Sequence, residues 1–264
     1  MQRLQRSVGM ALLGIFFAIG CGAKPQDASA KSDAPMQLAE ATDAAPAATP
    51  AGGATVAGSV KFSGTAPAAE HIKMDADPQC KLAHPEAVSK QDVVVNANGT
   101  LQHVFVYVKS GLEGKTFPAP KDAVKLDQHG CMYSPHVMGV QVNQPFEIVN
   151  DDATLHNVNC KPTKSKPFNL AQPVKGMKSS KSFTTPEIMV KCVCNVHPWM
   201  AAYVGVLDHP FYSVTDDQGT FSLAGLPAGT YTIEAWHEKY GAQTQDVTVG
   251  DGESKTTNFE FKAQ

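Results

Sequence analysis

Short runs rich in β-branched and aromatic residues recur along the chain from about residue 101 to its end. They include residues 101–108, 144–150, 201–207, 229–237 and 258–261. Turn-forming residues such as Asn, Asp, Gly and Pro stand between these runs, and no long stretch has the apolar period of an amphipathic helix. Strands of this kind bury their apolar faces by packing one sheet on another. The sequence therefore predicts an all-β fold built as a β-sandwich.

One loop following a strand-like run carries a set of metal-binding side chains. Cys194, His197 and Met200 have C-x-x-H-x-x-M spacing and supply a thiolate, an imidazole and a thioether. This combination suits copper, because the soft sulfur donors favour Cu(I) and the imidazole binds both oxidation states. A second imidazole is expected from a neighbouring segment. His156, which directly follows the run at residues 144–150, is the candidate.

These two motifs resemble those of the cupredoxins, the small blue-copper β-sandwich proteins. His156 lies in a His-Asn-Val context, and the ligand loop has the amicyanin-like form with Pro after its His. The resemblance implies a cupredoxin-like Greek-key sandwich with one type 1 copper site. It assigns His156, Cys194 and His197 as equatorial ligands and Met200 as the axial ligand. It also implies that Asn157 ties the two ligand segments together.

Three other interpretations of the site remain open. A dinuclear copper centre on the same fold needs two bridging cysteines separated by three residues, whereas Cys192 and Cys194 are separated by one. Zinc also accepts thiolate and imidazole ligands but has no use for an axial thioether. Alternatively, His156 and His197 are ordinary structural residues of a disulfide-rich sandwich that binds no metal.

The C-terminal part of the chain, residues 208–264, consists of short strand-like runs and tight turns. Residues 215–233 resemble the carboxypeptidase regulatory-like domain, a small transthyretin-like sandwich that usually serves as an accessory or binding module. The copper domain is accordingly expected over residues 55–207. His136, His209 and His237 could contribute to a second metal site, although packing against strand neighbours is the commoner role of such residues.

Cysteine usage bears on the same site. The chain has six cysteines, and if Cys21 is removed from the count as a lipid-bearing residue, five remain. Cysteines in an oxidising compartment normally pair, so one of the five is left over, as expected for a copper ligand. The pairing we favour is Cys80 with Cys131 and Cys160 with Cys192. Four cysteines allow three connectivities, so this pairing is a hypothesis.

The N-terminus reads as a bacterial export signal. Residues 1–21 combine a basic start, an apolar run too short to span a bilayer and a lipobox-like ending at Cys21, which is the expected site of lipidation. Gly22 follows, which favours the outer membrane in a two-membrane envelope. Residues 22–54 are rich in Ala, Pro and Asp and predict a disordered tether. The protein is thus expected to face the periplasm or cell surface on a lipid anchor.

The expected activity is single-electron transfer with a redox protein such as a cytochrome or a dehydrogenase. The chain lacks the His-x-His pairs of copper oxidases and has no defensible Ser/His/Asp arrangement, so it is not expected to be an enzyme. No nucleic-acid partner is expected of a chain with net charge −3. The alternative is a non-redox surface module that binds glycan or protein. Lysines concentrate between the ligand segments and could steer an acidic partner: Lys161, Lys164, Lys166, Lys175, Lys178 and Lys181.

Overall fold

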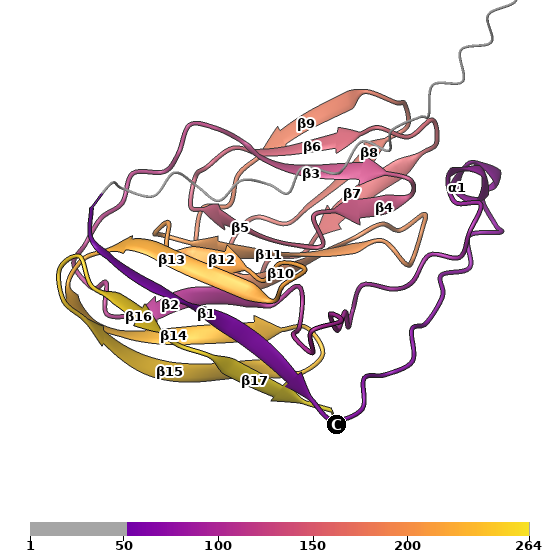
Figure 1. The fold of residues 1–264 in the computed structure, drawn as a ribbon. Helices are drawn as coiled ribbons and strands as arrows, with labels where there is room; N and C mark the ends of the chain where they lie inside the picture. Colours follow the sequence, from indigo (N-terminus) through magenta and orange to yellow (C-terminus); the bar gives the residue numbers. More distant parts are fainter. Residues whose placement is uncertain (1–51, 264) are drawn as a thin grey trace, which may run out of the picture. The chain divides into compact units, whose positions relative to one another are not determined.

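The computed structural model describes residues 52–263 (Figure 1). The proposed signal, Cys21 and nearly all of the proposed tether lie outside these residues. The described part is almost entirely β, with one short helix, which confirms the predicted fold class. It contains no helix that is long and apolar enough to cross a membrane.

Two sheets form the first sandwich. The four-stranded sheet has the order β4-β3-β6-β9, and the five-stranded sheet has the order β5-β11-β10-β7-β8. The strands of the four-stranded sheet are β3 (Val124–His129), β4 (Met132–Ser134), β6 (Phe146–Asn150) and β9 (Met177–Lys181). Those of the five-stranded sheet are β5 (Val137–Gln141), β7 (His156–Cys160), β8 (Phe168–Gln172), β10 (Glu187–Val193) and β11 (Ala201–Leu207). Their inner faces enclose one apolar core that includes Leu126, Ile148, Val158 and Val204.

Two further sheets form the second sandwich. One is β13-β1-β16 with β17 also paired to β1, and the other is β12-β2-β14-β15. The strands of the first are β1 (Ala54–Ser63), β13 (Thr220–Leu226), β16 (Ser254–Thr256) and β17 (Phe259–Lys262). Those of the second are β2 (Phe105–Ser110), β12 (Tyr212–Val214), β14 (Gly229–His237) and β15 (Gly241–Val249). Their core includes Val60, Val106, Ile233 and Phe261.

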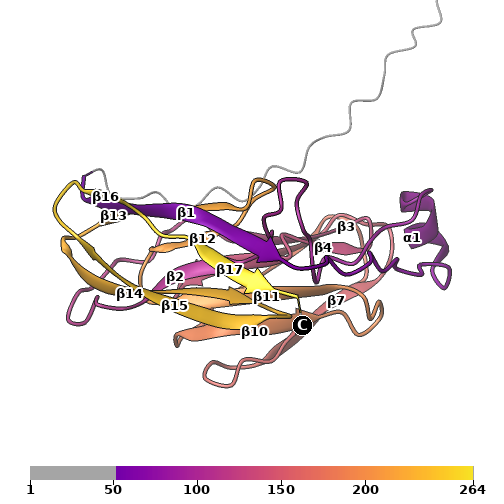
Figure 2. The same ribbon diagram turned by 60° about the horizontal axis from the view of Figure 1, so that its bottom comes forward.

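The second sandwich draws strands from both ends of the described chain. β1 pairs with β13 and with β17, and β2 pairs with β12 and β14 (Figure 2). The strands of the first sandwich, residues 124–207, are therefore inserted in sequence between β2 and β12. Residues 55–63 and 105–110 lie inside the range predicted for the copper domain, yet they complete the C-terminal sandwich. The boundary predicted at residues 207 and 208 consequently does not separate the two sandwiches.

A third apolar layer joins the five-stranded sheet to the sheet of β2 and β14. It contains Phe105, Tyr107, Tyr203 and Leu207, with Trp236 packed against it. Alternation along β2 explains this layer, because Val106 and Val108 face the second core while Phe105 and Tyr107 face the opposite side. β11 is likewise buried on both faces.

Glycine allows the close approach of these two sheets. A Cβ atom at Gly205 would lie 2.4 Å from Cζ of Phe105, and one at Gly139 would lie 2.2 Å from Cε2 of Tyr212. Neither distance is possible for a real side chain. The two rings therefore occupy space that only glycine leaves open.

The helix α1 (Pro78–Ala83) lies in the long connection between β1 and β2. Asp77 caps its N-terminus, and Pro78 starts it where the missing N–H has no cost. Figures 1 and 2 both place α1 at the end of the first sandwich near β3 and β4. The Cys80–Cys131 disulfide fixes it there.

Candidate metal centre

The candidate ligands lie at one end of the first sandwich. His156 is the first residue of β7, and Cys194 directly follows β10. His197 and Met200 lie in the connection from β10 to β11. The amide of Cys194 donates to the carbonyl of Met200 (3.1 Å), and the amide of Met200 donates to the carbonyl of His197 (3.0 Å). These two bonds fold the connection into a tight loop whose ends are fixed by paired strands.

Three of the four predicted ligands have their donor atoms close together. Nδ1 of His156 lies 2.9 Å from Nδ1 of His197, and Sγ of Cys194 lies 3.9 Å from the latter. The three donor atoms all lie within 4.8 Å of one another, and all three side chains are buried. A buried thiolate and two imidazole nitrogens facing one point are a donor set that copper favours. The residues present therefore fit a copper ion.

Met200 and Asn157 complete the immediate surroundings. Met200 is fully buried in the same apolar cluster as Cys194. Oδ1 of Asn157 accepts a hydrogen bond from the amide of Asn195 (2.7 Å) and one from the Cys194 thiol (3.4 Å). Asn157 thus bridges the segment that carries His156 and the loop that carries the other ligands.

The surroundings of Cys194 lower the pKa of its thiol. Burial alone would raise the pKa of the Cys194 thiol, but its interactions with His156 and with backbone amides lower this pKa to about 6. Burial would lower the pKa of His156, yet Asp152 and the Cys194 sulfur raise it to about 9. The lowered pKa of Cys194 favours the thiolate, which is the form that ligates metals.

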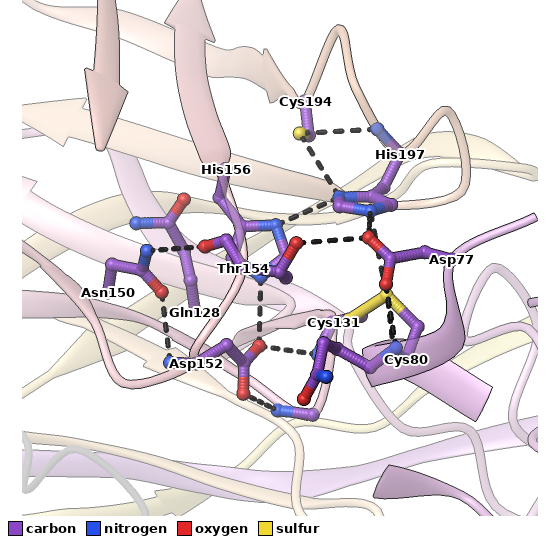
Figure 3. Close-up of polar contacts among 12 residues, drawn as sticks. Asp77, Cys80, Gln128, Cys131, Asn150, Asp152, Thr154, His156, Cys194 and His197 are labelled. Carbon is purple, nitrogen blue, oxygen red and sulfur yellow. Dashed lines mark hydrogen bonds and ion pairs between the residues drawn. A yellow bond between two sulfur atoms is a disulfide. The ribbon is translucent and has the colours of Figure 1, made fainter. Parts of the chain in front are cut away.

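Two carboxylates that the sequence analysis did not select lie against the imidazoles. Oδ2 of Asp152 lies 2.9 Å from Nε2 of His156, and Oδ2 of Asp77 lies 3.1 Å from Nε2 of His197 (Figure 3). Asp152 precedes His156 by four residues, a spacing that could have drawn attention to it. Asp77 lies 120 residues from His197, and no local signal connects the two.

The disulfides have the predicted pairing. Cys80 is bonded to Cys131, and Cys160 is bonded to Cys192, its direct cross-strand neighbour in β7 and β10. Among the described residues, Cys194 is the one free cysteine. Since the sulfur of Cys192 is committed to a disulfide, the two-cysteine dinuclear copper centre does not fit this site.

The other histidines considered for a second metal contact partners other than a shared metal-binding group. His136 contacts Glu238 and the carbonyl of Ala201, and His209 contacts the carbonyl of Val108. His237 accepts from the amide of Lys239. Within residues 52–263, no group of three metal-binding side chains includes any of these three histidines.

Trp199 packs against His197, and the lysines between the ligand segments are exposed. The ring of Trp199 lies 5.1 Å from that of His197, and its Nε1 donates to the carbonyl of Cys131 (2.9 Å). His197 itself is only 2% exposed, because Asp77 and the Cys80–Cys131 disulfide cover its outer edge. An apolar surface centred on the His197 ring is therefore not formed. The six lysines between the ligand segments are all exposed.

Comparison with known families matches the C-terminal part of the chain. Residues 198–262 match the carboxypeptidase regulatory-like domain. The match covers about a quarter of the chain, begins ten residues earlier than the predicted boundary and includes β11 of the first sandwich. No curated protein sequence matches this chain.

Solved structures similar to this chain include several copper proteins. An amicyanin mutant in the Cu(I) form is 24% identical, covers 38% of this chain and 97% of its own, and gives a TM-score of 0.29. A purple cupredoxin from Nitrosopumilus maritimus is 24% identical, covers 32% of this chain and 99% of its own, and gives a TM-score of 0.28. A copper-containing nitrite reductase from Thermus scotoductus SA-01 is 22% identical, covers 36% of this chain and 24% of its own, and gives a TM-score of 0.31. The chain thus spans about a quarter of the length of the reductase.

Proposed function

We propose that this protein is a type 1 (blue) copper protein that carries single electrons between redox partners and is not an enzyme. The supporting observation is the buried convergence of Nδ1 of His156, Nδ1 of His197 and Sγ of Cys194 within 4.8 Å. Copper held by these donors would supply one-electron chemistry between Cu(I) and Cu(II). Met200, fully buried on the same loop, is the proposed axial ligand.

The residues of the chain keep this site rigid. His156 and Cys194 are attached to strands that are joined by the Cys160–Cys192 disulfide and by backbone pairing of β7 with β10. Asn157 bonds the two ligand segments together. Donor atoms fixed in this way would move little when copper changes its oxidation state. Such a site favours fast electron transfer over substrate binding.

The proposed setting is the bacterial envelope. Cys21 would carry a lipid anchor, and residues 22–54 would tether the sandwiches, with the outer membrane favoured. The redox partner would be a protein such as a cytochrome or a dehydrogenase. Exposed lysines between β7 and β10 would favour a partner with an acidic surface.

The test is the visible and electron paramagnetic resonance spectrum of residues 22–264 loaded with Cu(II), with bound copper quantified. An intense thiolate-to-copper band with narrow hyperfine splitting and one copper per chain is the expected result. Cys194→Ser is the matched variant, because it removes the thiolate and keeps a side chain of similar size. A colourless wild-type protein, or one that binds only zinc, contradicts the proposal and favours a non-redox binding module.

A further inference from the structure

The outer edge of His197 is covered by an element that is not part of either sandwich. Oδ2 of Asp77 lies 3.1 Å from Nε2 of His197, and the sulfur of Cys80 lies 3.5 Å from the same nitrogen. Both residues come from residues 75–83, which contain α1 and the residues just before it and are called the α1 segment below. This segment belongs to the connection between β1 and β2. The side chain of His197 is only 3% exposed and that of Asp77 is 21% exposed. The imidazole is therefore buried, and the carboxylate lies at its partly exposed outer edge.

The carboxylate of Asp77 is held in one orientation. Its Oδ1 accepts from the amides of Gln79 (2.8 Å) and Cys80 (3.4 Å), as an N-cap residue does. Its Oδ2 accepts from the hydroxyl of Thr154 (3.0 Å) as well as from His197. Each oxygen thus has its own partners, and rotation of the group would break several hydrogen bonds.

The two carboxylates behind the imidazoles belong to one connected network. Asp152 accepts from the amides of Gly130 (2.8 Å) and Cys131 (2.7 Å) and contacts His156. The Cys80–Cys131 disulfide joins the backbone that holds Asp77 to the backbone that holds Asp152 (Figure 3). Each imidazole therefore presents Nδ1 to the centre of the site and Nε2 to a fixed carboxylate.

From this geometry we infer that Asp77 is a positioning residue that fixes the ring of His197 and lowers the reduction potential of the copper site. The inference rests on the proposed function. As the Nε2–H of His197 bonds to the carboxylate, Nδ1 is left free to ligate, and the imidazole becomes a stronger donor. The negative charge of Asp77 also stabilises Cu(II), the more positive of the two states, relative to Cu(I).

The experiment measures the midpoint potential of the copper-loaded protein by redox titration of its visible band. Asp77→Asn removes the charge but keeps one oxygen, and Asn is as good an N-cap as Asp. We expect the midpoint potential to rise by about 59 mV. For a one-electron couple, this shift is a tenfold change in the equilibrium ratio of Cu(I) to Cu(II) at a given potential. Loss of the band in this variant alone equally supports the positioning role.

Two further variants separate the charge from the fold. Asp75→Asn removes a carboxylate from the same segment, where Asp75 contacts Lys81 and no ligand, and it should leave the midpoint unchanged. Asp77→Glu restores the charge and should return the midpoint toward the wild-type value. If Asp77→Asn keeps its band and has the midpoint of Asp75→Asn, the inference is overturned while the proposed function stands. If the wild type shows no thiolate-to-copper band, the proposed function and the inference fall together.

Discussion

Removal of the Cys80–Cys131 disulfide should loosen the α1 segment and lower the stability of the protein. The bond joins residues separated by 51 positions. Chain entropy of a loop of this length gives a stabilisation of about 4.1 kcal/mol at 25 °C. The double variant Cys80→Ser, Cys131→Ser should therefore lose up to about that much free energy of unfolding, measured by urea denaturation of the copper-free chain.

A matched double variant at the other disulfide isolates the local effect. Cys160 and Cys192 are separated by 32 positions, for which the same relation gives about 3.7 kcal/mol. Both double variants should thus lose similar stability. Only the one lacking Cys80 and Cys131 should gain tryptic cleavage at Lys73 and Lys81, since α1 is held by this bond. Equal cleavage in both variants, or a stability loss under about 1 kcal/mol, would refute the reasoning.

The other predictions concern three single substitutions. Cys194→Ser should abolish the visible copper band and leave the far-ultraviolet circular dichroism spectrum unchanged; an unchanged band would remove Cys194 from the site. His237 is buried, and burial lowers its pKa to about 4, so the unfolded chain binds a proton that the folded chain excludes. The contribution of neutral His237 to the free energy of unfolding is therefore present above about pH 6.5, and it falls by about 2 kcal/mol from pH 7 to pH 5. In urea denaturation at the two pH values, His237→Asn should lose about 2 kcal/mol less stability between pH 7 and pH 5 than the wild type does. An equal loss in the two proteins would contradict this. Gly205→Val should destabilise the chain by at least about 2 kcal/mol, because its side chain must displace Phe105, and a wild-type urea midpoint would contradict this.

Local sequence patterns predicted the elements of this fold well. The strands expected at residues 201–207 and 229–237 have those bounds in the structure. Both disulfides also follow the predicted pairing. The strand bounds depend on side-chain alternation, which is visible along the chain without knowledge of its topology. The number of cysteines alone leaves three connectivities, and the pairing is favoured because Cys160 and Cys192 lie beside the predicted ligand segments.

Long-range pairing could not be predicted in the same way. β1 pairs in parallel with β17, about 200 residues later in the chain, and no pattern within either strand specifies the other. The position of Asp77 against His197 depends on the path of the whole connection from β1 to β2. A carboxylate beside an exposed turn is common, so its role becomes visible only when the folded chain brings it to the imidazole.

The sheet that carries the candidate ligand loop is packed on both of its faces. β10 and β11, which flank the ligand loop, belong to a sheet that packs on the first core with one face and on the layer around Phe105 with the other. A sheet buried on both faces resists displacement because interior packing is dense. The second sandwich therefore acts on the site as a second support for the ligand loop. Residues 124–207 are inserted between β2 and β12, which pair with each other, so both ends of the insertion enter the second sandwich at neighbouring strands. This double connection holds the five-stranded sheet beside the layer around Phe105.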